Sequence, residues 1–298
     1  TSFVIAGDAM FDRDVWNFYN KKGLKTIFDN FGTRPFRGTD LSLLNLEGPI
    51  SSSEITETRS REIMSFNFSP LIPSVLNYIN VNTVSLANNH TNNARDSGFQ
   101  NTKGVLEKAN INYFGQPVGL NDDSISRIEG PIPISIIGIM ALSNFDEQLL
   151  ESKIKEEKTL NRFVIIYPHW GEEYKEKHVA SQKNFASSWI KAGADLIVGS
   201  HPHVVEDFEL INNKPVVYSL GNFVFDQYFS QETQEGLVIA GEITNEKIRL
   251  SFLPTKQKNI QMSFVTGEKK TEKIGQIFDI NNGIGFKKLS SDTIEITR

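Results

Sequence analysis

The chain has 298 residues, of which 39% are hydrophobic and 22% charged, a composition typical of a globular protein with a substantial core. Its net charge of −5 argues against nucleic acid as the main partner, because phosphate binding depends on clustered Lys and Arg. Cysteine is absent, which excludes disulfides, thiolate nucleophiles and Cys-ligated metal sites. No apolar run approaches the ~20 residues that cross a bilayer. The chain begins at Thr1 rather than Met, which leaves open that an N-terminal segment, with an anchor, was removed.

Short apolar runs that end in polar turns predict buried strands. In chain order they are residues 3–6, 41–44, 83–86, 134–139, 163–167, 196–198 and 216–218. Patterns with helical spacing lie between many of them, at residues 71–79, 100–108, 148–158 and 179–191. This alternation of strand and helix indicates an α/β fold.

After Tyr218 the pattern changes to strands alone. The predicted strands are residues 236–243, 247–253, 261–266 and 274–280. We therefore divide the chain into a core, residues 1–245, and a β-rich C-terminal extension, residues 246–298, that completes the second sheet. Residues 51–61, rich in Ser, Thr and Glu, are predicted to form an exposed loop and are a candidate lid over the site.

Residues that can bind a metal ion follow five of the predicted strands. They are Asp8, then Glu47, then Asn89 with His90, then His169, and finally His201 with His203. Because ligands bind outside the carboxyl ends of the strands in open α/β sheets, we expect these segments to meet in one crevice. Four of the five histidines of the chain belong to this set.

Each segment alone also fits a structural role. A carboxylate directly after a strand, such as Asp8, is more often part of a turn, and a lone histidine such as His169 is more often packed and hydrogen-bonded. The sequence His201-Pro202-His203 is harder to explain in this way, because two imidazoles one residue apart point the same way from an extended segment. The joint arrangement favours metal ligands over structural turns, since five independent turns would rarely all place such groups at strand ends.

This ligand set suits one or two divalent transition-metal ions, namely Mn, Fe or Zn, because imidazole favours these ions and carboxylate and amide oxygens accept the harder among them. A metal site with open positions lowers the pKa of bound water and polarises a substrate oxygen, which is the chemistry of hydrolysis. If two ions lie ~3.5–4 Å apart, a bridging carboxylate is expected between them, and Glu47 is the candidate.

Six motifs of this chain, in order and spacing, resemble the bacterial capsule-synthesis CapA family (poly-gamma-glutamate capsule, PGA_cap). The resemblance covers roughly residues 3–255. The motifs are Gly7-Asp8-Ala9-Met10-Phe11-Asp12-Arg13, Asn45-Leu46-Glu47-Gly48-Pro49, Ala87-Asn88-Asn89-His90, His169-Trp170-Gly171-Glu172-Glu173-Tyr174, Ser200-His201-Pro202-His203 and Tyr218-Ser219-Leu220-Gly221-Asn222-Phe223-Val224-Phe225-Asp226. That family looks like a branch of the calcineurin-like metallophosphatases. The resemblance therefore implies a sandwich of two β-sheets flanked by helices.

The resemblance also implies a role for each site residue. Two residues would bind one metal ion, one would bridge, and three would bind the second ion, in the order Asp8 and His203, Glu47, and Asn89 with His169 and His201. His90 would be the proton donor, since imidazole has a pKa near neutrality. Arg13 would hold an anionic substrate oxygen in its planar guanidinium fork, or would instead form a surface salt bridge.

This chain departs from the related patterns at four places, one of which is Ser200 in the fifth motif, where Gly or His is common. Ordinary metallophosphatases have Asp-x-His at the first motif, whereas this chain, like the capsule family, has Asp8-Ala9-Met10. Glu47 stands where metallophosphatases use Asp. Asn93 and Arg95 occupy places after His90 where the family usually has Asp and Gly.

The resemblance implies a metal-dependent hydrolase or transferase that acts on a phosphoester or on amide bonds of a cell-surface polymer such as poly-gamma-glutamate. The alternative is a non-catalytic metal-binding module in polymer export or anchoring, which the missing imidazole of the first motif supports. The expected partners are an anionic small-molecule or polymer substrate and the capsule-synthesis machinery. The family implies an extracytoplasmic or cell-surface location, with the cytoplasm as the alternative.

Overall fold

A computed structural model describes residues 1–32, 36–57, 59–278 and 285–298 of the chain. The strands in these residues are β1 (Ser2–Ala9), β2 (Leu41–Leu46), β3 (Thr83–Ser85), β4 (Asn112–Phe114), β5 (Ile125–Ile128), β6 (Ile134–Met140), β7 (Phe163–His169), β8 (Leu196–Val198), β9 (Phe208–Ile211), β10 (Lys214–Val217), β11 (Asn222–Val224), β12 (Glu235–Ile243), β13 (Lys247–Lys258), β14 (Gln261–Phe264), β15 (Lys287–Lys288) and β16 (Thr293–Thr297). The α-helices are α1 (Arg13–Lys22), α2 (Ile72–Tyr78), α3 (Arg95–Lys108), α4 (Glu147–Thr159), α5 (Ala180–Ala192) and α6 (Glu268–Phe278). Short 3-10 helices are η1 (Leu24–Phe28), η3 (Asp122–Ser124) and η4 (Glu232–Gln234).

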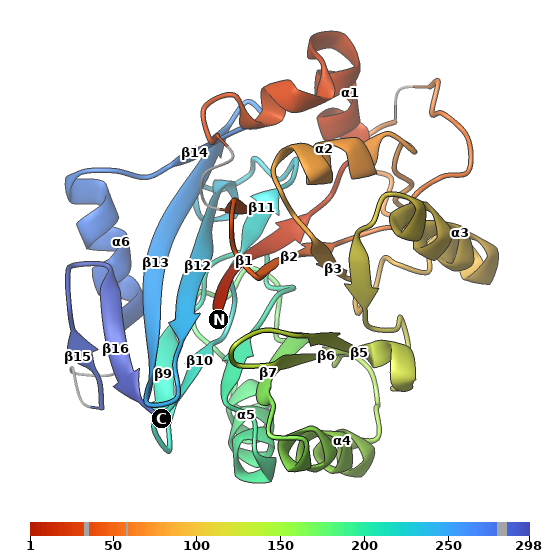
Figure 1. Cartoon of the computed structure of the whole chain (residues 1–298). Coiled ribbons are helices and arrows are strands. Elements are labelled where there is room, and N and C mark those ends of the chain that lie inside the picture. Colours follow the sequence, from red (N-terminus) through yellow and green to blue (C-terminus); the bar gives the residue numbers. More distant parts are fainter. Residues whose placement is uncertain (33–35, 58, 279–284) are drawn as a thin grey trace.

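The strands form two sheets (Figure 1). The ten-stranded sheet has the order β15-β16-β13-β12-β1-β2-β3-β4, with β11 pairing β1 and β14 pairing β13. The six-stranded sheet has the order β5-β6-β7-β8-β10-β9. In the centre of both sheets the strands run parallel, as in β1 with β2 and β6 with β7.

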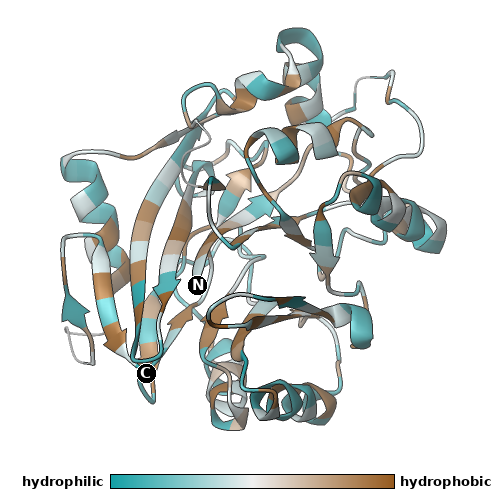
Figure 2. Ribbon diagram, in the orientation of Figure 1, coloured by the Kyte–Doolittle hydropathy of each residue, from teal (hydrophilic) through white to brown (hydrophobic). Residues whose placement is uncertain are grey.

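The inner faces of the two sheets bury one hydrophobic core. Alternate residues of each strand reach it, for example Phe3 and Ile5 from β1 and Phe163 and Ile165 from β7. The long strands β12 and β13 show the same alternation as bands of apolar and polar colour (Figure 2). Because each fully buried side chain of this size stabilises the fold by about 1.5–3 kcal/mol, this layer joins the two sheets.

The outer faces are covered by helices. The alternate residues of β1, Val4 and Ala6, belong to a second core that includes residues of α1, η1, α2 and α3. On the six-stranded sheet, Val164 and Ile166 pack in a third core that includes residues of α4 and α5. The prediction of two β-sheets flanked by helices is therefore confirmed.

The C-terminal segment differs in one element from the prediction. The strand expected at residues 274–280 is wrong, because residues 268–278 form the helix α6, and residues 279–280 lie outside the described residues. Ile274 and Ile277, three residues apart, face the inter-sheet core together with the partly buried Phe278, which is helical spacing. The strands β13, β14, β15 and β16 extend the ten-stranded sheet beyond β12. The domain division after residue 245 stays a prediction.

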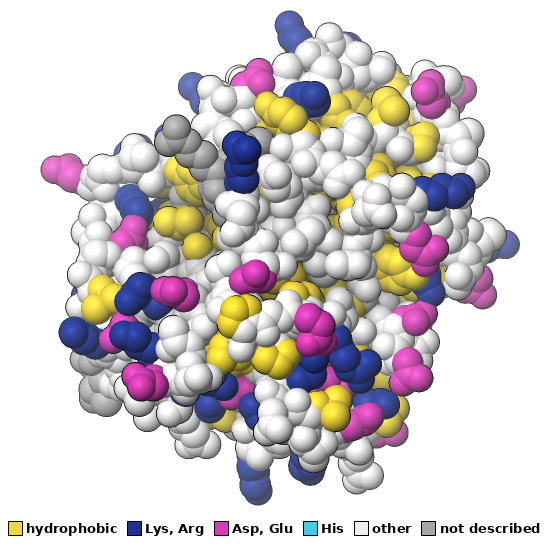
Figure 3. Space-filling model, in the orientation of Figure 1, with side chains coloured by type: hydrophobic (Ala, Val, Ile, Leu, Met, Phe, Trp, Pro, Cys, Tyr) yellow, Lys and Arg dark blue, Asp and Glu magenta, His cyan; other side chains and the backbone are white. Residues whose placement is uncertain are grey.

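Surface charges of both signs are intermixed on the face shown in Figure 3.

A close backbone approach brings the middle of the ten-stranded sheet together. A Cβ atom at Gly7 would lie 1.9 Å from the carbonyl oxygen of Gly221, so glycine is required there. The backbone N–H of Asp8 donates to that oxygen at 3.0 Å, which fixes the end of β1 beside β11.

Candidate metal centre

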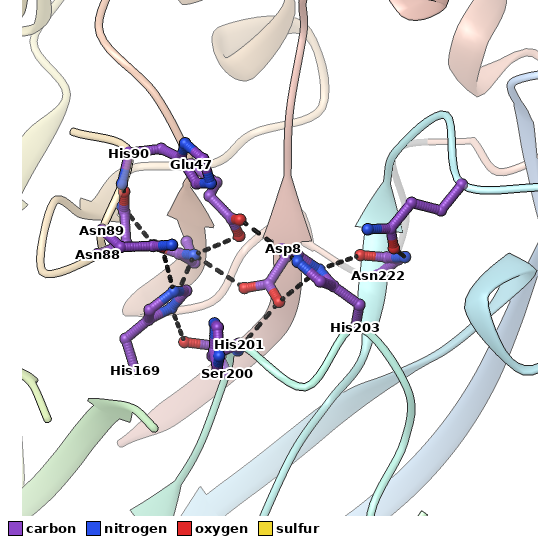
Figure 4. A network of polar contacts seen from close by, with 12 residues as sticks. Asp8, Glu47, Asn88, Asn89, His90, His169, Ser200, His201, His203 and Asn222 are labelled. Atoms are coloured by element: carbon purple, nitrogen blue, oxygen red, sulfur yellow. Dashed lines mark hydrogen bonds and ion pairs between the residues drawn. The ribbon is translucent and has the colours of Figure 1, made fainter. Parts of the chain in front are cut away.

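Strand register places the first carboxylate between two asparagines. Asp8 on β1 lies opposite Asn45 on β2 and opposite Asn222 on β11, and both pairings are parallel. Glu47 follows Asn45 by two residues and therefore points to the same side of the strand. Figure 4 shows the side chains of Asp8, Glu47 and Asn222 converging with those of the histidines. The carboxyl ends of β1 and β2 and the first residue of β11 thus deliver one polar cluster.

His203 completes a group of three candidate ligands with the two carboxylates. The ligand atoms of Asp8, Glu47 and His203 all lie within 4.8 Å of one another. His203 Nε2 is 3.7 Å from Glu47 Oε1, and its Nδ1 is 3.0 Å from Asn222 Oδ1. The amide nitrogen of Asn222 donates to Gln227 Oε1 and Thr233 O, so its oxygen accepts the Nδ1 proton of His203. The lone pair of His203 is then on Nε2, which faces Glu47.

A second group forms around His169. Its Nδ1 is 3.1 Å from Ser200 Oγ, and that hydroxyl donates to Pro168 O. Nδ1 also lies 3.4 Å from the amide nitrogen of Asn45. The other ring nitrogen, Nε2, lies 2.9 Å from Asn89 Oδ1, so the two atoms stand side by side where a cation could bind both. The ring of His201 is 4.8 Å from that of His169.

The segment that carries His201 and His203 is a bend. The expectation of an extended segment is wrong, because φ is 102° at His201 and 60° at His203. Non-glycine residues in this region cost of order 1–3 kcal/mol each, and such strain gathers at functional sites. The bend is tied to the centre, since the backbone N–H of His201 donates to Asp8 Oδ2 at 3.1 Å.

The predicted ligands other than Asn89 are buried, and two of them hold unsatisfied groups. Among the described residues, Glu47 Oε1 and His201 Nδ1 have no hydrogen-bond partner. Burial, followed by the neighbouring Asp8 carboxylate, raises the pKa of Glu47 well above its usual value. Burial also lowers the pKa of His201 to about 4 and that of His203 to about 3. Neutral imidazoles are the ligand form of histidine, and a cation would compensate the buried carboxylates. The residues present therefore fit a bound metal ion.

His90 lies at the edge of this centre and is held in a defined orientation. The backbone N–H of Phe66 donates to Asn93 Oδ1 at 2.7 Å, so this oxygen also accepts from His90 Nδ1 at 3.0 Å. The Phe66 ring covers the imidazole, with ring centroids 4.2 Å apart. Burial, with Arg13 acting in the same direction, lowers the pKa of His90. The backbone of Met64 also hydrogen-bonds the imidazole, so more than one contact holds the ring.

Arg13 is not in a surface salt bridge, the alternative considered above. It is 4% exposed and forms a buried ion pair with Asp226. Its Nη1 donates to the carbonyl oxygens of Arg61 and Ile63 at 3.0 and 3.3 Å, and its guanidinium lies over the Phe66 ring at 4.8 Å. Arg13 therefore connects α1 to the loop before Phe66, beside His90.

The structure brings all the predicted site residues into one region, and their individual roles stay predictions. Sequence reasoning assigned no role to Asn45, although its Nδ2 donates to Asp8 Oδ1 at 2.8 Å and to Glu47 Oε2 at 3.2 Å. It also gave none to Glu173, which lies within metal-binding reach of His201 and His203. The signal for Asn45 was its position two residues before Glu47, on the same side of the strand.

Fold and site together define a class: a two-sheet α/β sandwich with a buried centre of His, Asp and Glu side chains that could hold a metal ion. The chain belongs to the bacterial capsule synthesis protein PGA_cap family, which matches residues 2–129 and 119–227. This confirms the family inferred from the six motifs.

Two Bacillus proteins are similar to most of this chain. It is 31% identical over 255 residues to the PGA biosynthesis protein CapA of Bacillus subtilis (strain 168), covering 80% of this chain and 66% of that protein. It is 27% identical over 260 residues to the capsule biosynthesis protein CapA of Bacillus anthracis, covering 80% and 62%. The chain therefore spans less than two thirds of the length of each relative.

A more distant similarity is to a probable polyglutamine synthesis accessory protein of Mycobacterium tuberculosis (strain ATCC 25618 / H37Rv). The identity is 23% over 219 residues, which cover 63% of this chain and 56% of that protein. Within the described part of the chain, no helix is both long and apolar enough to span a membrane.

Proposed function

We propose that this protein is a metal-dependent hydrolase or transferase of the CapA type, acting on a phosphoester or on amide bonds of a cell-surface polymer such as poly-gamma-glutamate. One observation carries the proposal. The ligand atoms of Asp8, Glu47 and His203 lie within 4.8 Å of one another, in a buried centre where Glu47 Oε1 and His201 Nδ1 lack hydrogen-bond partners among the described residues. The names of the Bacillus relatives support the polymer.

The metal would be held by ligands from both sheets. Asp8 and His203 would bind one ion of Mn, Fe or Zn, and Glu47 would bridge to a second ion. The second ion would be held by Asn89, His169 and His201. When bound, such ions polarise the substrate oxygen and lower the pKa of bound water. The asparagines at positions 45 and 222 would orient the ligands, since partners of this kind fix the ring and tautomer of ligating histidines.

His90 would protonate the leaving group. Its Nδ1 is held by Asn93 at 3.0 Å, so the proton would pass from Nε2 of the imidazolium. Stacking on Phe66 keeps the ring from turning away. A general acid must reach the leaving atom within hydrogen-bond distance. Because the ring is held in one orientation, it would reach only a leaving atom that lies on the Nε2 side.

Three arginines lie near the centre, and each forms an ion pair with an aspartate. Arg13 pairs with Asp226, Arg59 with Asp12 at 3.1 Å, and Arg61 with Asp14 at 2.9 Å. Arg61 is the most exposed of the three arginines. Together these arginines lie on α1 or on the loop after β2. We propose that Arg13 and this loop orient an anionic oxygen of the substrate, with the capsule-synthesis machinery as partner at the cell surface.

The second candidate is a non-catalytic metal-binding module in polymer export or anchoring. The side chain of Met10 favours it, because metallophosphatases carry an imidazole there and Met10 Sδ instead accepts the backbone N–H of Asp12 at 3.0 Å. The M. tuberculosis relative carries the word accessory in its name. Under this hypothesis the chain binds metal and has no turnover.

The experiment is a substrate screen with the metal-loaded protein. We expect hydrolysis of aryl or alkyl phosphoesters or of gamma-linked glutamate peptides, and loss of this activity in Glu47→Gln. Glu246→Gln is the matched control, because Glu246 lies exposed in the turn between β12 and β13. Metal binding without turnover on any of these substrates would favour the non-catalytic module.

A further inference from the structure

A cavity of about 690 Å³ lies away from the predicted ligands. Its walls come from the segment after Tyr174, the segment after His203, the ends of β12 and β13, and α6. Glu206, Gly236 and Thr255 form its buried part, and Glu176 and Glu272 stand exposed at its rim.

Glu206 is a buried carboxyl group that no cation pairs with among the described residues. It is 1% exposed, and its Oε2 accepts from Gln182 Nε2 at 2.7 Å. Its Oε1 has no hydrogen-bond partner among the described residues, nor does Thr255 Oγ1. Burial, followed by the neighbouring Asp207 carboxylate, raises the pKa of Glu206 to about 8. A buried carboxyl group of this kind lacks the positive charge that would stabilise its ionised form.

The neighbouring acids have partners, which singles out Glu206. Asp207 accepts from His178 Nδ1 at 3.0 Å, and Glu235 forms an ion pair with Lys273 at 2.5 Å. No ion pair joins Glu206 to a cation in the part of the chain that the structure describes. Six carboxyl groups and two lysines line the cavity, so its field is negative and favours a positively charged occupant.

We propose that this cavity binds a small organic cation, whose ammonium or guanidinium group pairs with the carboxyl group of Glu206. The cation supplies the charge that the buried carboxyl group lacks. The exposed acids Glu176 and Glu272 at the rim attract it electrostatically. The site differs in residues from the metal centre and does not depend on the function proposed above.

The test compares two ligands of nearly equal shape, butylguanidinium and the neutral butylurea, by isothermal titration calorimetry on the whole chain. We expect butylguanidinium to bind with one site per chain and butylurea to bind about 10-fold to 100-fold more weakly, as expected for the loss of a charge-assisted hydrogen bond. Glu206→Gln should weaken butylguanidinium binding by a similar factor. Glu246→Gln removes the same charge at the opposite end of the β12–β13 hairpin and should leave binding unchanged.

Three results would overturn the proposal: no saturable binding of butylguanidinium, equal affinity for both ligands, or unchanged affinity in Glu206→Gln. Binding lost in Glu47→Gln but kept in Glu206→Gln would place the cation at the metal centre and also overturn it. If Glu206→Gln does not fold, the double variant Glu176→Lys with Glu272→Lys carries the test, since both side chains are exposed. It should weaken binding by about threefold to tenfold, and unchanged binding would contradict the proposal.

Discussion

Polar neighbours decide which nitrogen of each histidine can act. Asn222 accepts from Nδ1 of His203, and Asn93 accepts from Nδ1 of His90. In both cases Nε2 is the nitrogen that remains for the proposed chemistry. For His203 it faces Glu47, and for His90 it is the position from which a proton would leave in the proposed reaction. Ring orientation thus distinguishes a proposed ligand from the proposed proton donor, although both are histidines.

The role of His90 is tested by His90→Asn. We expect metal content and fold to stay intact and turnover to slow by roughly 10²–10⁴-fold, the range of general acid–base catalysis. The loss should be smaller for a nitrophenyl ester, whose leaving group needs little protonation, than for an alkyl ester or amide. Steady-state rates on both substrates check this. Equal losses would indicate a displaced Asn89, and a drop in bound metal would make His90 a ligand.

The buried Glu206 predicts a pH dependence of stability. Its folded pKa of about 8 lies above the unfolded value of about 4.3, so the folded state binds more protons between these values. Its contribution to stability is therefore fully present at pH 4 and is lost as the pH rises to 8, by up to roughly 5 kcal/mol. Urea denaturation from pH 5 to 8.5 should show a steeper decline for the native chain than for Glu206→Gln. Parallel curves would contradict a raised pKa.

At the level of elements, the buried ion pair of Arg13 and Asp226 joins α1 to the segment after β11. Asp226 also accepts the backbone N–H of Asp14 at 3.2 Å, and both partners of the ion pair are nearly inaccessible to solvent. Removing one partner of such a pair leaves an uncompensated buried charge.

We therefore expect Asp226→Asn to lower the free energy of unfolding by about 3–5 kcal/mol. Chemical denaturation followed by circular dichroism measures it. Asp29→Asn is the control, because Asp29 is exposed and such changes usually stay within about 0.5 kcal/mol. A loss no larger than that of the control would mean that the ion pair does not anchor α1.

The predictable elements were those whose pattern is set by burial alone. Strands such as β7 are apolar on both faces because each face is covered, and this gives a continuous apolar run. The helix α6 was missed because its apolar face is narrow, formed by Ile274, Ile277 and Phe278, and a short segment of this kind also fits a strand. The bend at His201 and His203 could not be foreseen, since positive φ at these residues is imposed by surrounding contacts. Asn45 was overlooked because its role depends on the register between β1 and β2.

At the scale of the whole molecule, the centre lies where the two sheets meet. Asp8 lies near the end of β1, and Glu47 and Asn89 follow β2 and β3 of the same ten-stranded sheet. In the six-stranded sheet His169 ends β7, and His201 and His203 follow β8. A bound ion would join both sheets. Because a ligand that binds only the folded state stabilises it by mass action, metal removal should lower the stability of the entire fold, and the extent should grow with metal affinity.

The most direct test of the account is the metal content of the purified chain, measured by elemental analysis after exposure to Mn, Fe and Zn. We predict one or two ions per chain in the native protein and in Glu246→Gln, with a clear loss in both Glu47→Gln and His201→Ala. Glu47→Gln should lose metal because an amide does not neutralise two cations. A native chain without bound metal, or unchanged metal content in both site variants, would contradict the claim that this centre holds metal.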